Sequence, residues 1–209
     1  MKIVRNVLCP KSFNGDLSSP KLSIDRQNQI DEIVSMIKTI DISGFKTKLS
    51  LEKTKKGKLV YSPSLINYAI AKKMKELGFT ANRNFYSTNI MTGKPRYYQV
   101  DFVREDLTVE VQLGKYFAMA ADYNRYKIVT KLYPVAKFLI MVVPGDNLYR
   151  QMSKGPGRCD DIIQDLSLIA EPQYPVLVIG IDPDDAEDLS NEDRDEWNKM
   201  AIHNSEVCT

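Results

Sequence analysis

The spacing of hydrophobic residues predicts that helices and strands alternate along the chain. Apolar residues recur at helical spacing over residues 23–40, 63–77 and 117–132, and shorter helices are expected near 147–152 and 160–170. Ser23 or Asp25 is a suitable N-cap for the first helix. Pro63 and Gly78 are typical of the first turn and the C-terminal end of the second.

Strands are predicted between these helices. The apolar runs AKFLIMVVP (136–144) and PVLVIGID (175–182) are typical of strands buried on both faces. Residues 82–104 alternate around a turn at Gly93 and predict a hairpin, and a further strand is expected at 107–113. The N-terminal 22 residues begin like a strand and continue as a loop, and the lysine-rich residues 46–63 are typical of a loop or loose hairpin. The later βαβ order predicts an α/β fold with central strands and outer helices.

One short segment combines a strand pattern with candidate chemistry. In DFVREDLTVEVQ (residues 101–112), Val109 and Val111 alternate with Glu110 and Gln112, so the two pairs point to opposite faces of a strand. With the valines in the core, Glu110 and Gln112 face a cleft that Asp101 can join. Two carboxylates and an amide at one place suit a hard cation such as Mg²⁺. A surface strand with a polar outer face explains the same alternation.

The charges are distributed unevenly. Of 29 Lys and Arg and 27 Asp and Glu, two basic and ten acidic residues lie from Asp182 onward, which leaves 27 basic and 17 acidic groups before it. Between Lys46 and Arg96 there are twelve basic residues and two acids. A basic body with an acidic C-terminal segment is found in nucleic-acid-binding proteins, although a lysine-rich surface is often merely solvated.

Length and composition favour an ordinary globular protein. With 209 residues and 43% hydrophobic content, we expect one domain over residues 1–209, of which about 182–209 form an acidic extension with a helix at about 192–203. The apolar run FLIMVV is too short to cross a bilayer, and no signal peptide opens the sequence. We therefore expect a cytoplasmic protein without a membrane partner.

Several chemistries lack the residues that they need. Cys9, Cys159 and Cys208 are far apart and without CxxC spacing, so neither a zinc site nor a disulfide framework is indicated. The single histidine, His203, leaves no Ser-His-Asp triad and no His-rich metal site. The sequence has no GxGxxG or GxxxxGK[ST] phosphate loop. Acid-and-metal chemistry at residues 101–112 remains.

The spacing of Asp101, Glu110 and Gln112 resembles the PD-(D/E)xK nuclease motif in the variant in which Gln replaces Lys, with Val100 where Pro is common. That variant belongs to type II restriction endonucleases of the BglII and BstYI group, and TVEVQLGKY is similar to their motif strand. EKTKKGKLVYSPSLINYAIAKKMKELGF is similar to a basic loop and helix of BstYI, which the chain resembles most. FLIMVVP, MSKG and PVLVIGI follow in the order of the family. The resemblance covers about residues 30–183 and implies a restriction-endonuclease-like core, with a central mixed β-sheet flanked by α-helices.

The resemblance also implies roles for individual residues. Asp101 and Glu110 would bind Mg²⁺ together with the backbone carbonyl of Val111. Gln112 would take the place of the usual Lys and orient the attacking water or a phosphate oxygen. Because an amide is not a base, Gln112 would not remove the proton from that water. Asn82 is a candidate for an additional site residue.

The same resemblance suggests how DNA is read. Lys115, Ser153 and Lys154 are candidates for base contacts, because a lysine can donate to guanine in the major groove. For Lys115 a phosphate contact or a solvated side chain is the alternative. Contacts to the DNA backbone, which position the duplex without specifying its sequence, are expected from Lys53, Lys55, Lys56 and Lys58.

The resemblance therefore implies a homodimeric, Mg²⁺-dependent type II restriction endonuclease whose subunits meet at the helix over residues 117–132. Two-fold symmetry implies a palindromic site in double-stranded DNA. Similarity to BstYI implies a GATC-centred site such as RGATCY and cleavage that leaves 5′-phosphate ends, with a cognate DNA methyltransferase as genetic partner.

Three alternatives stay open at this point. The first is another nuclease of the same fold, such as a repair or junction enzyme, although such enzymes more often keep Lys in the motif. The second is a non-catalytic or inactivated DNA-binding module of the same fold. The third is a protein that binds acidic partners through residues 46–96, with Glu110 and Gln112 serving the structure alone.

Overall fold

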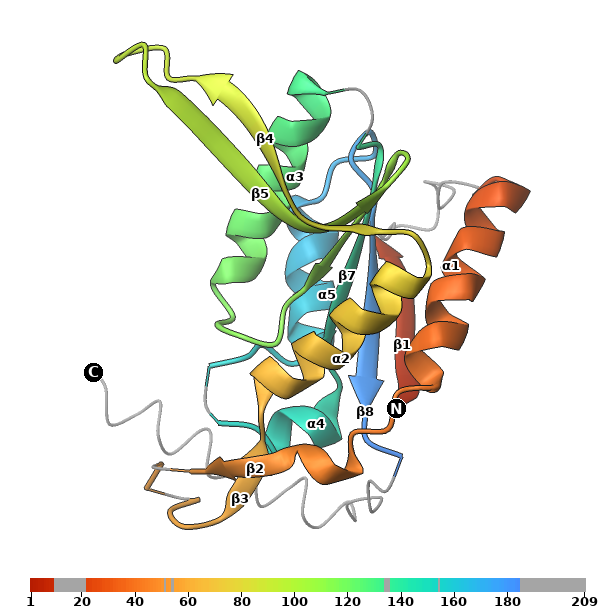
Figure 1. The fold of residues 1–209 in the computed structure, drawn as a ribbon, viewed down its shortest axis with the longest axis vertical. Coiled ribbons are helices and arrows are strands. Elements are labelled where there is room, and N and C mark those ends of the chain that lie inside the picture. Colours follow the sequence, from red (N-terminus) through yellow and green to blue (C-terminus); the bar gives the residue numbers. More distant parts are fainter. Residues whose placement is uncertain (10–21, 51, 54, 134–135, 154, 185–209) are drawn as a thin grey trace.

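A mixed β-sheet forms the centre of the molecule. The computed structural model describes residues 1–9, 22–50, 52–53, 55–133, 136–153 and 155–184, and in this part of the chain the main sheet has six strands in the order β1-β8-β7-β6-β5-β4 (Figure 1). The neighbours β6, β7 and β8 run parallel, whereas β1, β5 and β4 join as antiparallel strands. The strands are β1 (Lys2–Cys9), β4 (Thr80–Thr88), β5 (Pro95–Arg104), β6 (Leu107–Val111), β7 (Phe138–Pro144) and β8 (Val176–Asp182).

Helices cover both faces of this sheet. Figure 1 shows α1 and α2 on one face and α3 and α5 on the other. Every residue of β7 and β8 is buried, as the apolar runs predict, because each strand contributes alternate side chains to the cores on the two faces. The helices are α1 (Ile24–Lys38), α2 (Pro63–Glu76), α3 (Ala118–Leu132), α4 (Asp146–Arg150) and α5 (Cys159–Ile169). The predicted α/β class, a mixed sheet flanked by helices, is confirmed.

Local sequence signals explain where the first two long helices begin and end. The Ser23 hydroxyl caps α1 by accepting from the Arg26 amide at 3.2 Å. Pro63 occupies the first turn of α2, where a missing N–H costs no hydrogen bond. Gly78 follows that helix with φ of 80°, a conformation in which a Cβ would be strained. The predicted N-cap of α1 and both predicted end signals of α2 are therefore confirmed, whereas α1 ends at Lys38, two residues before the predicted end at 40.

Two hairpins extend from this body. β4 and β5 form a long arm that projects beyond the sheet (Figure 1), with a turn in which the Asn89 side chain accepts from the amides of Met91 and Thr92. The short strands β2 (Lys46–Leu49) and β3 (Leu59–Tyr61) form a separate two-stranded sheet, which confirms the loose hairpin predicted there.

Some predicted boundaries were wrong, and the reasons are tertiary. The strand expected at 107–113 begins at Leu107 but ends at Val111. The helix expected near 147–152 begins at Asp146, where the Asp182 carboxylate accepts from the Leu148 amide at 2.8 Å. The N-terminal strand pairs with β8, a contact between distant segments that no local pattern reveals.

The acidic extension is predicted to begin at about residue 182. Asp182 is the last residue of β8 and is only 2% exposed, so it belongs to the sheet. The helix expected at 192–203 lies outside the described residues. None of the helices described has the length and apolar character needed to span a membrane.

Candidate active site

The Asp101 and Glu110 side chains lie on neighbouring strands. Asp101 is near the end of β5 and Glu110 is in β6, and the antiparallel register pairs Phe102 with Val109. The Val111 amide donates to Asp101 Oδ2 at 2.9 Å, which ties the first carboxylate to the strand of the second. Gln112 follows β6 directly, and its backbone amide donates to the Val142 carbonyl at 2.8 Å. The structure thus brings together the three residues that the motif singles out.

The alternation of side chains along β6 places Glu110 on the opposite face of the sheet from Val109 and Val111. Val109 and Val111 pack into the core on the α1 and α2 side. Glu110 faces α3, where Arg125 Nη1 lies 3.9 Å from its Oε1 atom. Glu110 is 3% exposed and Gln112 is 8% exposed. The alternative of a surface strand with a polar outer face is therefore wrong.

Helix α3 adds two residues that the motif does not include. Asp122 is 7% exposed, and it accepts a hydrogen bond from the Gln112 side-chain nitrogen. Arg125 Nη1 lies 3.0 Å from Asp122 Oδ1 and donates to the Gln99 carbonyl of β5 at 3.1 Å. The site is therefore built from β5, the end of β6 and one face of α3.

The sequence does contain a signal for Asp122, which the motif alone misses. Met119, Tyr123, Tyr126 and Val129 form the buried stripe of α3, and Asp122 falls within that stripe. A charged residue at a buried helical position is nearly always paired or functional. Its partner cannot be read from the sequence, because Gln112 lies on a different element.

Burial controls the ionisation of these acids. Burial raises the pKa of Glu110 to about 9, and the negative charges of Asp101 and Asp122 act in the same direction while Arg125 opposes them. Burial also raises the pKa of Asp122, against the lowering effect of Arg125 and of the Gln112 hydrogen bond. The site therefore concentrates acidic groups where water screens them poorly.

The arrangement fits a divalent cation. No three side chains of His, Cys, Asp or Glu in the described residues form a metal-binding group, so a cation site here has two carboxylates and needs main-chain or solvent ligands. The charge of Asp101 makes ionisation of Glu110 less favourable, and Arg125 is beyond hydrogen-bonding distance of Glu110. A hard cation between the two carboxylates would offset that repulsion, and oxygen ligands are those that Mg²⁺ prefers.

Asn82 lies beside this site. The register of β4 and β5 pairs Ala81 with Phe102 and Arg83 with Val100, which leaves Asn82 next to Asp101. Asn82 is exposed and has φ of 50°, an uncommon backbone conformation for a residue other than glycine. The additional site residue suggested by the resemblance thus lies opposite Asp101 on the neighbouring strand.

The segment that follows Gln112 is linked to the loop after α4. Lys115 is exposed, and the Tyr116 amide donates to the Gly155 carbonyl at 2.6 Å. A Cβ on Gly157 would collide with the Tyr116 ring, so the loop packs closely here. Ser153 is partly exposed at the start of this loop. Lys115 and Ser153 therefore flank one surface, while Lys154 lies outside the described residues.

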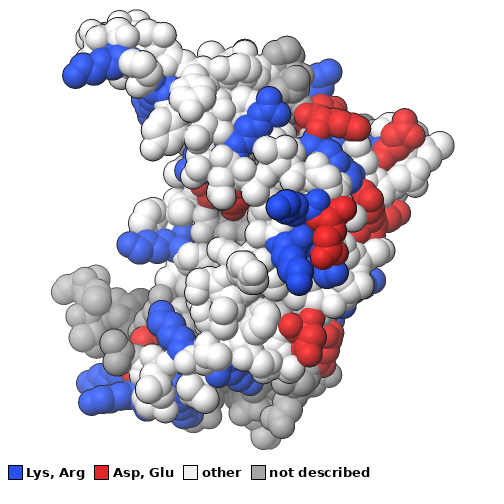
Figure 2. All heavy atoms as spheres, viewed as in Figure 1, with Lys and Arg blue, Asp and Glu red and all other residues white. Residues whose placement is uncertain are grey.

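The lysines of the β2–β3 hairpin differ from one another. Lys53, Lys56 and Lys58 are exposed. Lys55 is partly buried, and its amine donates to the Met152 carbonyl at 2.8 Å, which anchors the hairpin to the segment after α4. Lys55 is therefore a structural residue in this conformation. Figure 2 shows basic side chains on the arm and around β2–β3, on either side of a hollow in which acidic atoms are visible.

Comparison with known proteins agrees with this architecture. The fold is similar to the crystal structure of restriction endonuclease BglII complexed with a DNA 16-mer, with a TM-score of 0.66 and 19% sequence identity over 88% of this chain and 79% of that one. No curated protein matches the chain. The family model of restriction endonucleases BglII and BglIII matches residues 18–181. The chain therefore belongs to the BglII/BglIII family of restriction endonucleases.

Proposed function

We propose that the protein is a Mg²⁺-dependent type II restriction endonuclease that cleaves both strands of a palindromic DNA site as a homodimer. One observation carries the proposal. In a chain of this family, Asp101 and Glu110 lie on adjacent strands, with Gln112 directly after the second. Two carboxylates and an amide are suited to holding a cation and a water beside a phosphodiester.

The proposed metal ligands are Asp101, Glu110 and the carbonyl of Val111. A bound Mg²⁺ would supply Lewis acidity, which acidifies a water and stabilises charge on the phosphate. The chain itself holds the ligands in place, since the Val111 amide donates to Asp101 and both strands belong to the central sheet. Gln112 orients the attacking water or a phosphate oxygen by hydrogen bonding, and it transfers no proton because an amide is not a base. Asn82, beside Asp101, is a further candidate for contact with the scissile phosphate.

DNA contacts are proposed on the surface around this site. Exposed Lys115, with Ser153 and Lys154, is proposed to read bases in the major groove. Lys53, Lys56 and Lys58 are proposed to bind phosphates. Lys55 is the exception within the predicted set, because its amine is engaged by the Met152 carbonyl.

The finer specificity is also a proposal. Similarity to BstYI in the basic segment at 52–79 and in the motif strand supports a GATC-centred site such as RGATCY. Hydrolysis would leave 5′-phosphate ends. A chromosome that encodes such an enzyme needs protection at the same site, so a cognate DNA methyltransferase is the expected partner.

Cleavage of unmethylated phage DNA tests the proposal. Wild-type protein with Mg²⁺ is expected to yield discrete fragments, and sequencing of their ends reads the site and the cut position. Glu110→Ala should abolish cleavage while DNA binding persists. Glu32→Ala is the control, because Glu32 pairs with Arg104 away from the site and its removal should leave cleavage unchanged.

The outcomes separate the alternatives. Discrete fragments without GATC ends would keep the enzyme class and remove the proposed specificity. Intact DNA from folded wild-type protein in both Mg²⁺ and Mn²⁺ would contradict the proposal and favour a DNA-binding module.

A further inference from the structure

The environment of the Gln112 amide is unusually well defined for a side chain that the motif places at the reacting centre. Its nitrogen donates to Asp122, and its oxygen accepts from the Gly114 amide at 3.3 Å. The two ends of an amide have nearly the same shape, so hydrogen bonds decide which way the group points. Here the nitrogen donates to a carboxylate oxygen, and the amide oxygen accepts from a backbone N–H, which can only donate.

Arg125 forms an ion pair with the Asp122 carboxylate, which in turn accepts the hydrogen bond from the Gln112 amide. Its guanidinium lies 3.0 Å from Asp122 Oδ1 and donates to the Gln99 carbonyl, two residues before Asp101 on β5. Asp122 thus uses one oxygen for Gln112 and the other for Arg125. The chain of contacts runs from β5 through Arg125 and Asp122 to Gln112, so the orientation of the amide is coupled to the strand that carries Asp101.

We propose that Asp122 and Arg125 are positioning residues that fix the amide of Gln112 for DNA cleavage. This inference rests on the proposed nuclease function. An amide nitrogen carries two hydrogens. Asp122 accepts one of them, which leaves the second for the attacking water or a phosphate oxygen. Without the carboxylate, the amide can turn and present its oxygen, which would repel a phosphate.

A purely structural role for the pair is the competing explanation, since Asp122 and Arg125 also attach α3 to the sheet. The two roles differ in their dependence on Gln112. A structural anchor acts on stability whichever residue occupies position 112, whereas a positioning residue has an effect on cleavage only while Gln112 is present.

Single-turnover cleavage with enzyme in excess tests this dependence. Asp122→Asn is expected to lower the cleavage rate constant about 10–100-fold, the range for residues that orient ligands in metal sites. DNA affinity measured in Ca²⁺ should stay the same. Gln112→Ala should be slow by itself, and Gln112→Ala/Asp122→Asn should be no slower than Gln112→Ala. Multiplying effects in the double variant would overturn the inference.

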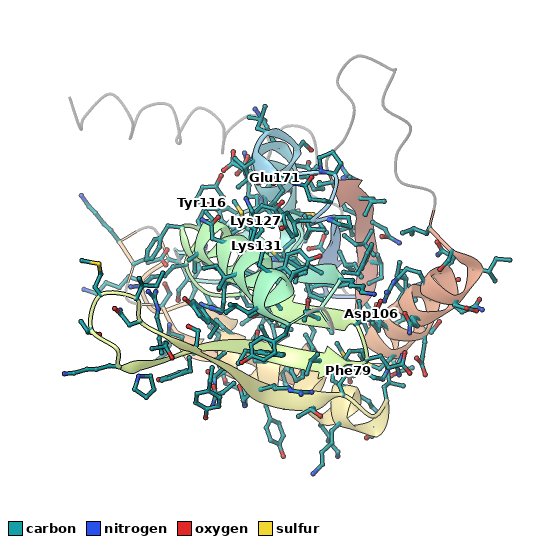
Figure 3. All side chains as sticks on the ribbon, turned by 90° about the horizontal axis from the view of Figure 1, so that it is seen from above. Phe79, Asp106, Tyr116, Lys127, Lys131 and Glu171 are labelled. Atoms are coloured by element: carbon teal, nitrogen blue, oxygen red, sulfur yellow. The ribbon has the colours of Figure 1, made fainter. Side chains whose placement is uncertain are left out.

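Asp106→Asn is the matched control. Asp106 also forms a partly buried ion pair with an arginine, Arg26, at 2.6 Å. Figure 3 shows it on the α1 side of the molecule, away from Tyr116 and the α3 residues Lys127 and Lys131. Removal of this ion pair should leave the cleavage rate unchanged. A decrease like that of Asp122→Asn would mean that breaking any such pair slows the enzyme, and would count against positioning.

A second readout needs neither metal nor activity. In ¹⁵N-labelled, metal-free protein, the side-chain NH₂ signals of Gln112 are identified by their absence in Gln112→Ala. Asp122→Asn should shift these signals and speed their exchange with water. If Asp122→Asn does not fold, Arg125→Lys provides the same test, because it weakens the support of Asp122 while keeping the charge.

The two readouts separate the inference from the function on which it rests. The inference is overturned, and the nuclease function left intact, if the wild-type protein cleaves DNA but neither Asp122→Asn nor Arg125→Lys shifts the Gln112 side-chain signals. If the wild-type protein does not cleave DNA but Asp122→Asn shifts the Gln112 side-chain signals, the nuclease function is overturned while the orientation of Gln112 by Asp122 stands.

Discussion

At the scale of single residues, the most informative side chains are acids that lie where apolar residues are expected. Glu110 sits in a strand whose five residues are all buried, and Asp122 sits in the buried stripe of α3. Burial of a carboxylate is unfavourable unless hydrogen bonds, opposite charges or a cation offset it. Their presence in a folded core is the reason to treat this place as a candidate functional site.

Cys159 illustrates the opposite case, a buried titratable group with no role in the site. Burial raises the pKa of its thiol to about 12, from an ordinary value of 9.0. The folded protein thus retains a proton that the unfolded chain releases above pH 9. This contribution to stability is complete below pH 9 and is lost as the pH rises towards 12.

We expect the free energy of unfolding of the wild type to fall faster above pH 9 than that of Cys159→Ala, by at most about 1.4 kcal/mol per pH unit. Urea denaturation at several pH values measures the difference. Val178→Ala is the control, because it truncates a buried side chain in the same core without removing a titratable group. Parallel curves for wild type and Cys159→Ala would contradict the raised thiol pKa.

At the scale of elements, the close approach of helices to the sheet determines the site. Helix α3 must lie near β6 for Asp122 to reach Gln112, and α5 packs beside it on the same face. Gly180 in β8 marks one such approach. A Cβ added there would lie 2.6 Å from the Cys159 Sγ atom of α5 and 3.2 Å from the Arg5 Cβ atom of β1.

Gly180→Ala is therefore expected to destabilise the protein by about 1–3 kcal/mol, the usual cost of overpacking a core. The neighbouring atoms include Cβ carbons, which are fixed to the backbone and cannot rotate away. Thermal or urea unfolding gives the value. Gly44→Ala should change stability by less than about 0.5 kcal/mol, since a Cβ added there would meet no atom within 4 Å. Equal losses of stability at the two positions would mean that α5 shifts to accommodate the added methyl group at little cost.

At the scale of the whole molecule, the β4–β5 arm and the β2–β3 hairpin border the face that bears the hollow (Figure 2). The net charge of +2 for the whole chain does not reveal the excess of basic residues between Lys46 and Arg96. Phosphate neutralisation by lysine releases counterions, so it appears as a dependence of affinity on salt.

Lys56→Ala should weaken DNA binding uniformly across sequences and should reduce the slope of log affinity against log salt by about 0.9 for each phosphate that this lysine neutralises. Lys137→Ala is the control. Lys137 is also exposed, but it precedes β7 at the end of the parallel strands opposite to Gln112. Fluorescence anisotropy at several salt concentrations gives both slopes. An unchanged slope for Lys56→Ala would remove that lysine from the proposed interface.

The proposed dimer predicts an effect on assembly. Phe117 at the start of α3 is 72% exposed, so it is available for the subunit contact that the resemblance places at this helix. Phe117→Asp should convert a dimer into a monomer that nicks one strand or loses cleavage, as measured by sedimentation and by plasmid assays. Ile24→Asp, at an exposed position of α1, should remain dimeric. A dimeric Phe117→Asp protein would place the subunit contact elsewhere.

Much of the architecture could be predicted from the sequence alone because it depends on local periodicity. The buried strands β7 and β8, the start of α1, both ends of α2, and the arm all follow from the hydrophobic pattern and from Ser23, Pro63 and Gly78. The proximity of Asp101 and Glu110 could also be predicted, because the two residues are near each other in the sequence. The alternation of side chains along β6 separates Glu110 from Val109 and Val111.

Only the tertiary structure decided the rest, because it depends on contacts between distant elements. The pairing of β1 with β8, the engagement of Lys55 by the Met152 carbonyl, and the convergence of Asp122 and Arg125 on Gln112 join residues that no periodic pattern relates. The sequence alone singled out Asp101, Glu110 and Gln112 as the side chains with the chemistry proposed for a nuclease. Packing of α3 against the sheet brought the buried Asp122 and the partly exposed Arg125 to Gln112, and the contacts among these three side chains join them in one site.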